Sequence, residues 1–316
     1  MSLKSRVFIS CGQRKNNELT IAKQIAAKLE EMGFDPYIAV EEQCLKGVKE
    51  NIFKRLEKSE YFLFIDFKRE RLYKINGGFV DTGKHRGSLF SHQELAIATF
   101  QDYEVLAFQE EGVKKDDGIL KFIQANCIQF SERRHLPCIV AEKVMERKWD
   151  PTWRNEIVLN RDDNDFQDAR VPGGGVAKFY HIKVINHHKD KIARNCIAYV
   201  ERIKNLENGK TRVLELSELK WKGSRTEGVS IAPKLFRYLD AFNVFYSSPT
   251  IVNLGLNPFI VDWQGYIQDY QIRGSGDYEI DYVVFSEDFS PARAKFRLHI
   301  GTQIQDVEFQ ISSMQK

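Results

Sequence analysis

The stretch YFLFIDF, Tyr61–Phe67, is a nearly continuous apolar run in the first half of the chain. Such a run is typical of a central strand that is buried on both faces, as in a parallel sheet. Four shorter segments flank it along the chain and also favour strands: RVFIS at 6–10, PYIAV at 36–40, EVLAF at 104–108 and CIQF at 127–130. The first half therefore predicts five strands, with 61–67 at the centre.

Apolar residues at helical spacing separate these strands. Ile21, Ile25 and Leu29 recur four residues apart, and Gly33 follows where a helix would end. Further helices are expected around 48–56, 91–100, 118–126 and 137–148. Strands and helices that alternate in this order predict an α/β domain with a flavodoxin-like, doubly wound, parallel five-stranded sheet.

In the second half of the chain, apolar residues recur at a different spacing. The polar segment at 161–165 and the glycine-rich segment at 172–175 indicate a linker. Beyond it, side chains alternate between apolar and polar around 180–184, 278–282 and 294–300, which is typical of strands with one buried face. We expect three parts: an α/β domain at 1–150, a linker at 151–175, and an all-β, immunoglobulin-like sandwich at 176–316.

The composition excludes several classes of protein. The 316 residues carry a formal net charge of only +3, so the sequence indicates neither a nucleic-acid partner nor a membrane partner. The 5 cysteines are scattered without a C-x-x-C pair, which predicts no metal site and no disulfide framework. No apolar run approaches the roughly 18 residues of a membrane span. We therefore expect a cytoplasmic protein with reduced thiols.

The loops after the predicted strands are the expected place for a ligand, because open parallel sheets bind ligands outside the carboxyl ends of their strands. Four segments lie there: 11–17, 41–47, 66–71 and 88–94. The chain contains neither G-x-G-x-x-G nor G-x-x-x-x-G-K-[ST]. A nucleotide would therefore be bound by side chains rather than by a glycine-rich phosphate loop.

Several of these segments resemble the core of TIR domains. They are VFIS at 7–10, GFDPYIAV at 33–40, and Gly47 leading into KENIFKRLEKSEYFLFI at 49–65. The segment SLFSHQEL, Ser88–Leu95, resembles the TIR signature of a serine, an aromatic and a small residue, and a glutamate before leucine. The resemblance covers residues 6–130. The usual tryptophan is Phe90 here, the usual cysteine is Ser91, and the segment 68–87 is longer than is typical.

The resemblance implies that Glu94 is the catalytic residue of an enzyme that cleaves the nicotinamide–ribose bond of NAD. Such an enzyme is an NAD glycohydrolase or ADP-ribosyl cyclase in prokaryotic signalling or antiphage defence. NAD is then a substrate, with no separate cofactor and no metal. The resemblance also implies self-association through this domain, and leaves the ligand of the sandwich unknown. The candidate substrate-binding residues are Ser10, Cys11, Gly47, Asp66, Ser88, Phe90 and Ser91.

Other interpretations of the same residues stay open. The domain can be a non-catalytic TIR scaffold, or an N-glycosidase like the nucleoside deoxyribosyltransferases. Ser91-x-x-Glu94 is also a capping box, in which the serine and the glutamate cap a helix. Asp66 is either a ligand of a ribose hydroxyl or a strand-end turn residue. His92 is either a base or an exposed histidine at the start of a helix.

Overall fold

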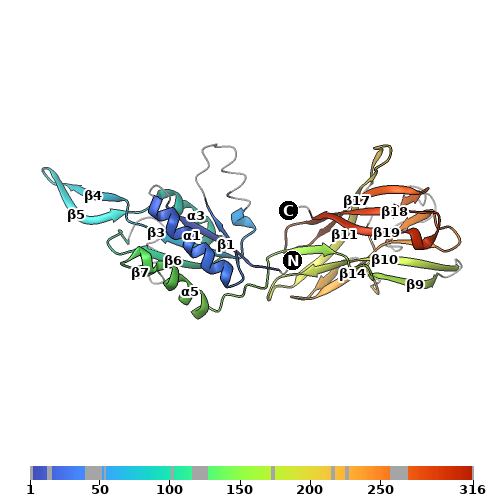
Figure 1. Ribbon diagram of the computed structural model, residues 1–316, viewed down its shortest axis with the longest axis horizontal. Coiled ribbons are helices and arrows are strands. Elements are labelled where there is room, and N and C mark those ends of the chain that lie inside the picture. The colour runs from blue at the N-terminus through green and yellow to red at the C-terminus, as the bar shows by residue number, and fades with distance from the viewer. Residues whose placement is uncertain are drawn as a thin grey trace. The chain divides into compact units, whose positions relative to one another are not determined.

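The computed structural model describes residues 3–12, 16–39, 52, 55–100, 103–115, 127–171, 175–214, 218–224, 228–256 and 270–314. The chain divides into two compact units, Met1–Asn155 and Glu156–Lys316 (Figure 1). Among the described residues, no helix is long and apolar enough to cross a membrane.

A five-stranded parallel sheet forms the centre of the first unit. Its strand order is β2-β1-β3-β6-β7. The strands are β1 (Arg6–Cys11), β2 (Asp35–Ile38), β3 (Tyr61–Asp66), β6 (Glu104–Glu110) and β7 (Cys127–Phe130). Every residue of β3 is buried, including Asp66 at its end, as its nearly continuous apolar run predicts.

Helices cover both faces of this sheet. They are α1 (Asn16–Glu31), α3 (Leu89–Phe100) and α5 (Leu136–Glu146), the last preceded by the 3-10 turn η2 (Arg133–His135). Helices α1 and α5 share a core with Val7 and Ile9, whereas Leu95 of α3 shares a separate core with Phe8. Because successive strand residues point to opposite faces, the two cores lie on opposite sides of the sheet.

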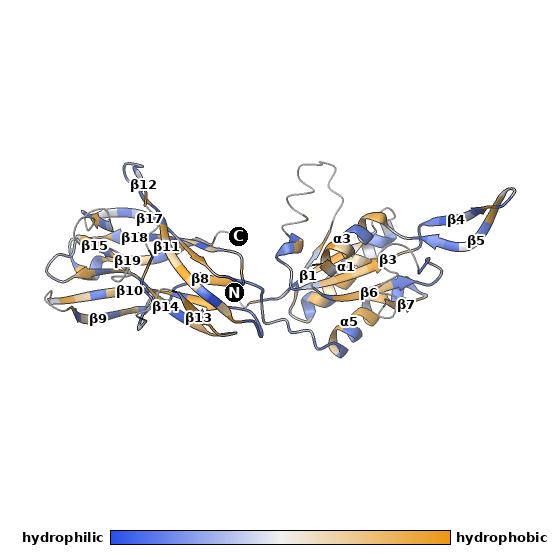
Figure 2. Cartoon of the chain, turned by 180° about the vertical axis from the view of Figure 1, so that it is seen from behind, coloured by the Kyte–Doolittle hydropathy of each residue, from blue (hydrophilic) through white to orange (hydrophobic). Residues whose placement is uncertain are grey.

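A long β-hairpin, β4 (Glu70–Ile75) with β5 (Phe79–Arg86), is inserted between β3 and α3. It extends away from the sheet as a two-stranded ribbon (Figure 1). Ile75 and Phe79 pair across it and are 84% and 83% exposed. Apolar residues are visible at its tip in Figure 2. The sequence pointed only to the unusual length of the segment 68–87 and not to a hairpin.

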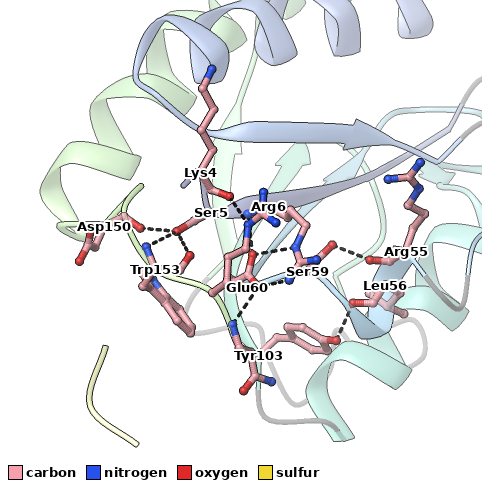
Figure 3. A network of polar contacts seen from close by, with 12 residues as sticks. Lys4, Ser5, Arg6, Arg55, Leu56, Ser59, Glu60, Tyr103, Asp150 and Trp153 are labelled. Atoms are coloured by element: carbon pink, nitrogen blue, oxygen red, sulfur yellow. Dashed lines mark hydrogen bonds and ion pairs between the residues drawn. The ribbon is translucent and has the colours of Figure 1, made fainter. Parts of the chain in front are cut away.

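A network of polar contacts closes the first unit at the amino ends of β1 and β3 (Figure 3). The Glu60 carboxylate accepts hydrogen bonds from the Arg6 backbone N–H and guanidinium and from the Asn155 N–H. The Ser5 hydroxyl lies within hydrogen-bond distance of the carbonyl oxygens of Asp150 and Trp153. These contacts tie residues 150–155 to the start of the chain, so that the unit extends to Asn155.

Two antiparallel sheets form the second unit. One contains β8 (Ile157–Asn160), β9 (Phe166–Val171), β10 (Gly175–Asn186), β14 (Phe236–Phe245), β15 (Ile251–Leu254) and β16 (Gln271–Arg273). The other contains β11 (Ala193–Asn205), β12 (Thr211–Val213), β13 (Val229–Ile231), β17 (Gly276–Phe285), β18 (Ala292–Ile300) and β19 (Glu308–Met314), with the 3-10 turn η4 (Ile304–Asp306) before β19. Both sheets contribute to one core, which includes Ile182, Phe242, Tyr282 and Phe296.

The expected fold class, a flavodoxin-like doubly wound α/β sheet followed by an immunoglobulin-like sandwich, is wrong. The structure is 50% strand and only 19% helix. Among the described residues, three of the four sheets are antiparallel and one is parallel. The physical reason is that most strand residues pair in antiparallel fashion, both in the inserted hairpin and in long strands such as β10 and β11. The chain as a whole is mostly β.

The strand order of the second unit also departs from the immunoglobulin pattern. In that pattern one sheet has the strand order A-B-E-D, so the outer strand D comes before its neighbour E in the chain. Here the strand next to β10 is β14, and the strand outside it, β15, comes after β14 in the chain. The stretch 151–175, expected to be a linker, differs as well: β8 and β9 fall within it, and both pair with β10. Antiparallel pairing with β10 makes both segments regular strands.

Candidate functional site

The carboxyl edge of the parallel sheet gathers polar side chains from three neighbouring strands. Ser10 lies near the end of β1, and Asp66 ends β3, in register with Gln109 on β6. Strand order reverses between β1 and β3, because β2 lies on one side and β6 and β7 lie on the other. Ligands of open parallel sheets bind at such a position.

Glu94 reaches this edge from helix α3. Its side chain is half-buried, and its Oε2 atom accepts a hydrogen bond of 2.5 Å from the Ser10 hydroxyl. Burial raises the pKa of the Glu94 carboxyl to about 7, and the hydrogen bond from Ser10 offsets only part of that effect. Both protonation states are therefore populated near neutral pH, as is common for groups that work in proton or charge chemistry.

Asp66 is fully buried and is held by groups of the protein itself. Its Oδ1 atom accepts the Ser88 backbone N–H at 3.3 Å, and its Oδ2 atom accepts the Gln109 side-chain amide at 3.3 Å. The Nε2 atom of His92 lies 3.1 Å from the same Oδ2 atom. The side chain of Asp66 is 0% exposed, so no oxygen is presented to a ribose hydroxyl. Asp66 instead fixes the start of α3 to the end of β3.

Gly87 makes this close approach possible. A Cβ atom at position 87 would lie 1.4 Å from the Oδ1 atom of Asp66, far inside contact distance. Any side chain at this position would push the carboxylate away from the start of α3.

His92 is not the exposed helix-start histidine that one interpretation expected. Its side chain is only 11% exposed, and its ring packs edge-on against Phe64 with centroids 5.6 Å apart. Together with the contact to Asp66, this packing holds the imidazole in one orientation on the sheet face.

The capping-box interpretation of Ser91 and Glu94 does not describe the structure. Helix α3 begins at Leu89, so that Ser91 lies inside the first turn rather than before it. The Ser91 N–H points to the Ser88 hydroxyl at 3.5 Å, and the Glu94 carboxylate bonds to Ser10 on β1. Ser88 therefore occupies the position of the helix cap.

The other predicted residues lie around this edge in different environments. Ser10, Cys11, Ser88 and Ser91 are buried. Phe90 is 68% exposed at the first turn of α3, where a planar ligand can reach it. Gly47 lies outside the described residues. The structure thus brings together Ser10, Asp66, Ser88, Ser91 and Glu94, but it buries most of them.

Sequence reasoning missed one member of this site, Gln109, and one contact, that between His92 and Asp66. Gln109 is 1% exposed and joins Asp66 to the Gln129 amide. Its role depends on strand register, which no local pattern reveals. The contact between His92 and Asp66 was missed for the same reason, although the sequence had pointed to both residues separately. Among the described residues, no group of three or more His, Cys, Asp or Glu could hold a metal ion.

Comparison with known proteins adds little to this geometry. No family model and no curated protein matches the chain. One solved structure with some similarity is described as "X-ray structure of Northeast Structural Genomics Consortium target SoR45". The two are 16% identical over 46% of this chain and 86% of that chain, with a TM-score of 0.21. A likeness at this TM-score supports no assignment of fold or function.

Proposed function

We propose that the first unit cleaves the nicotinamide–ribose bond of NAD, or the corresponding N-glycosidic bond of a related nucleotide. The observation that carries the proposal is Glu94, a half-buried carboxyl with a pKa near 7 at the carboxyl edge of a parallel sheet, bonded to Ser10. The resemblance of 88–95 to the TIR signature points to the same residue.

The chemistry requires little beyond one well-placed carboxylate. Positive charge develops on the ribose as the bond to the pyridinium nitrogen breaks, and an ionised Glu94 beside the sugar stabilises that charge. The nicotinamide departs as a neutral base, because the electron pair of the broken bond cancels its ring charge. Water is partly excluded around Glu94, which strengthens the attraction between carboxylate and cation.

Phe90 and Ser10 have supporting roles in this proposal. The exposed Phe90 ring offers a flat apolar surface for a base or nicotinamide ring. The Ser10 hydroxyl orients the carboxylate by donating to one oxygen, which leaves the other for the sugar. Asp66 is not part of the substrate contact, because its oxygens are used inside the protein.

The wider biological setting follows from the TIR resemblance. We place the protein in the cytoplasm, where thiols such as those of Cys11 and Cys127 stay reduced. The setting that fits is signalling or antiphage defence, with self-association through the first unit and with a product that is linear or cyclic ADP-ribose. The second unit would recognise a separate ligand or protein.

The test is incubation of the purified full chain with NAD, with free nicotinamide measured by chromatography. Parallel incubations contain deoxynucleosides in place of NAD. The proposal predicts nicotinamide from NAD and no free base from deoxynucleosides. Base release from deoxynucleosides alone would select the deoxyribosyltransferase-like alternative. Release from neither would select the non-catalytic scaffold and would contradict the proposal.

A further inference from the structure

Two titratable side chains of α3 lie over neighbouring strands on the same face of the sheet. Ser10 on β1 is the register partner of Phe64 on β3, so their side chains lie side by side. Glu94 bonds to Ser10, and the ring of His92 packs on Phe64. The helix therefore places an imidazole beside the proposed catalytic carboxyl.

Asp66 orients this imidazole. Both oxygens of Asp66 accept N–H donors, from Ser88 and from Gln109, as expected of a carboxylate. A carboxylate can only accept, so in the neutral ring of His92 the Nε2 atom carries the hydrogen and points to Asp66. The lone pair then lies on Nδ1, which no protein group engages within the described part of the chain.

We propose that His92, held by Asp66, accepts the proton of the water that attacks the ribose. This inference rests on the proposed function and adds a second working group to the same site. As the bond between the anomeric carbon and nicotinamide breaks, its electron pair goes to the nicotinamide nitrogen. A water oxygen bonds to the anomeric carbon, and one water proton passes to Nδ1 of His92. The products are nicotinamide, ADP-ribose and a protonated imidazole, which returns its proton to solvent.

The groups around His92 suit this role. Asp66 on β3 stabilises the imidazolium that forms, as a buried carboxylate does in acid–base dyads. Glu94, on the same helix, is an ionisable group over the neighbouring strand. Cys127 on β7 interacts with Asp66, and burial, with a smaller contribution from the charge of Asp66, raises the pKa of its thiol to about 12. The thiol stays protonated and does not compete for the proton.

The decisive experiment is chemical rescue of a His92→Gln variant. Gln can still donate to Asp66 but cannot take up a proton. Loss of a general base typically lowers the rate about 10²–10⁴-fold. Azide is a nucleophile with no proton to remove, so added sodium azide should restore cleavage of NAD by His92→Gln and give ribosyl azide. Glu94→Gln should not be rescued, because it lacks the charge that stabilises the ribose.

The matched control is His135→Gln, which removes an exposed histidine of η2 and should behave as the parent. The variants must first show parent-like melting, and His92→Asn serves if His92→Gln does not fold.

The outcomes separate this inference from the proposed function. If the parent releases nicotinamide and His92→Gln does so equally fast, the role of His92 is wrong while the function stands. If His92→Gln is slow but azide does not restore it, His92 is structural rather than a proton acceptor. If the parent releases no nicotinamide, the proposed function itself fails, and the role of His92 fails with it.

Discussion

At the scale of single residues, Glu94 ties the stability of the first unit to pH. The pKa of its carboxyl is about 7 in the folded protein and 4.5 as the ordinary value, because burial opposes ionisation. The unfolded chain therefore loses this proton first, and the free energy of unfolding falls as pH rises from about 4.5 to about 7. The shift corresponds to a loss of roughly 3 kcal/mol.

Glu94→Gln removes the charge and should remove this loss. We expect the variant to match the parent near pH 4.5 and to be more stable than the parent at pH 8, as measured by urea unfolding at both pH values. Glu30→Gln, at an exposed position of α1, is the control and should change neither result. Equal stability of Glu94→Gln and the parent at pH 8 would show that burial does not raise the pKa.

Ser10 supplies the hydrogen bond that partly opposes this shift. Ser10→Ala removes a donor to the carboxylate, so the pKa of Glu94 should rise further above its value in the parent. Carbon-detected NMR titration of the carboxyl measures the change. Ser59→Ala is the matched control, since the Ser59 hydroxyl bonds to the Arg55 carbonyl at the opposite edge of the sheet. A pKa that stays constant or falls in Ser10→Ala would contradict the assigned contact.

At the scale of elements, the hairpin β4–β5 and helix α3 differ in how much they are packed. Phe79 at the hairpin tip is 83% exposed, whereas Leu95 of α3 is fully buried. We expect Phe79→Ser to change the free energy of unfolding by no more than about 0.5 kcal/mol. Leu95→Ala should cost about 2–5 kcal/mol, because it leaves a cavity between α3 and β1. Thermal melts of both variants test this; a large loss in Phe79→Ser would mean that the tip is covered.

Local patterns located many individual elements well. The segments expected as strands at 6–10, 61–67, 104–108 and 127–130 overlap β1, β3, β6 and β7. Apolar periodicity is a local property, so it can mark where a strand or helix lies. The fold class was wrong because it depends on which strands pair and in which direction. The hairpin at 70–86 and the strand β9 are largely polar in composition and become regular through their partners, whereas β8 is apolar but lay inside the expected linker.

In the candidate site, too, local sequence signals pointed to single residues but not to the contacts between them. Glu94 and Asp66 were found from a motif and from a strand end, which are local signals. The contacts that these two residues make were not predicted, because the hydrogen bonds Ser10–Glu94 and Asp66–Gln109 join residues far apart in the chain. Asp66 is also buried rather than exposed to a ribose hydroxyl. A strand-end aspartate is exposed or buried according to what packs above it, which the local sequence does not show. Here Gly87 admits the start of α3 directly over it.

At the scale of the whole molecule, the boundary between the two units lies at Asn155 rather than after a linker. A fragment of residues 156–316 retains β8 and β9, whose side chains Ile157 and Leu159 are buried in the second core. A fragment of residues 176–316 loses both strands. We expect the longer fragment to melt cooperatively at a clearly higher temperature, as followed by circular dichroism. Equal melting of the two fragments would contradict the assignment of these strands to the second core.

The central claim is that Glu94 performs chemistry on a nucleotide at the edge of the parallel sheet. The most direct test is nicotinamide release from NAD at pH 8 by the parent, by Glu94→Gln and by Glu30→Gln. We predict release by the parent and by Glu30→Gln, and a rate about 10²–10³-fold lower for Glu94→Gln, although that variant is the most stable of the three at this pH. Release by Glu94→Gln at the parental rate would contradict the claim.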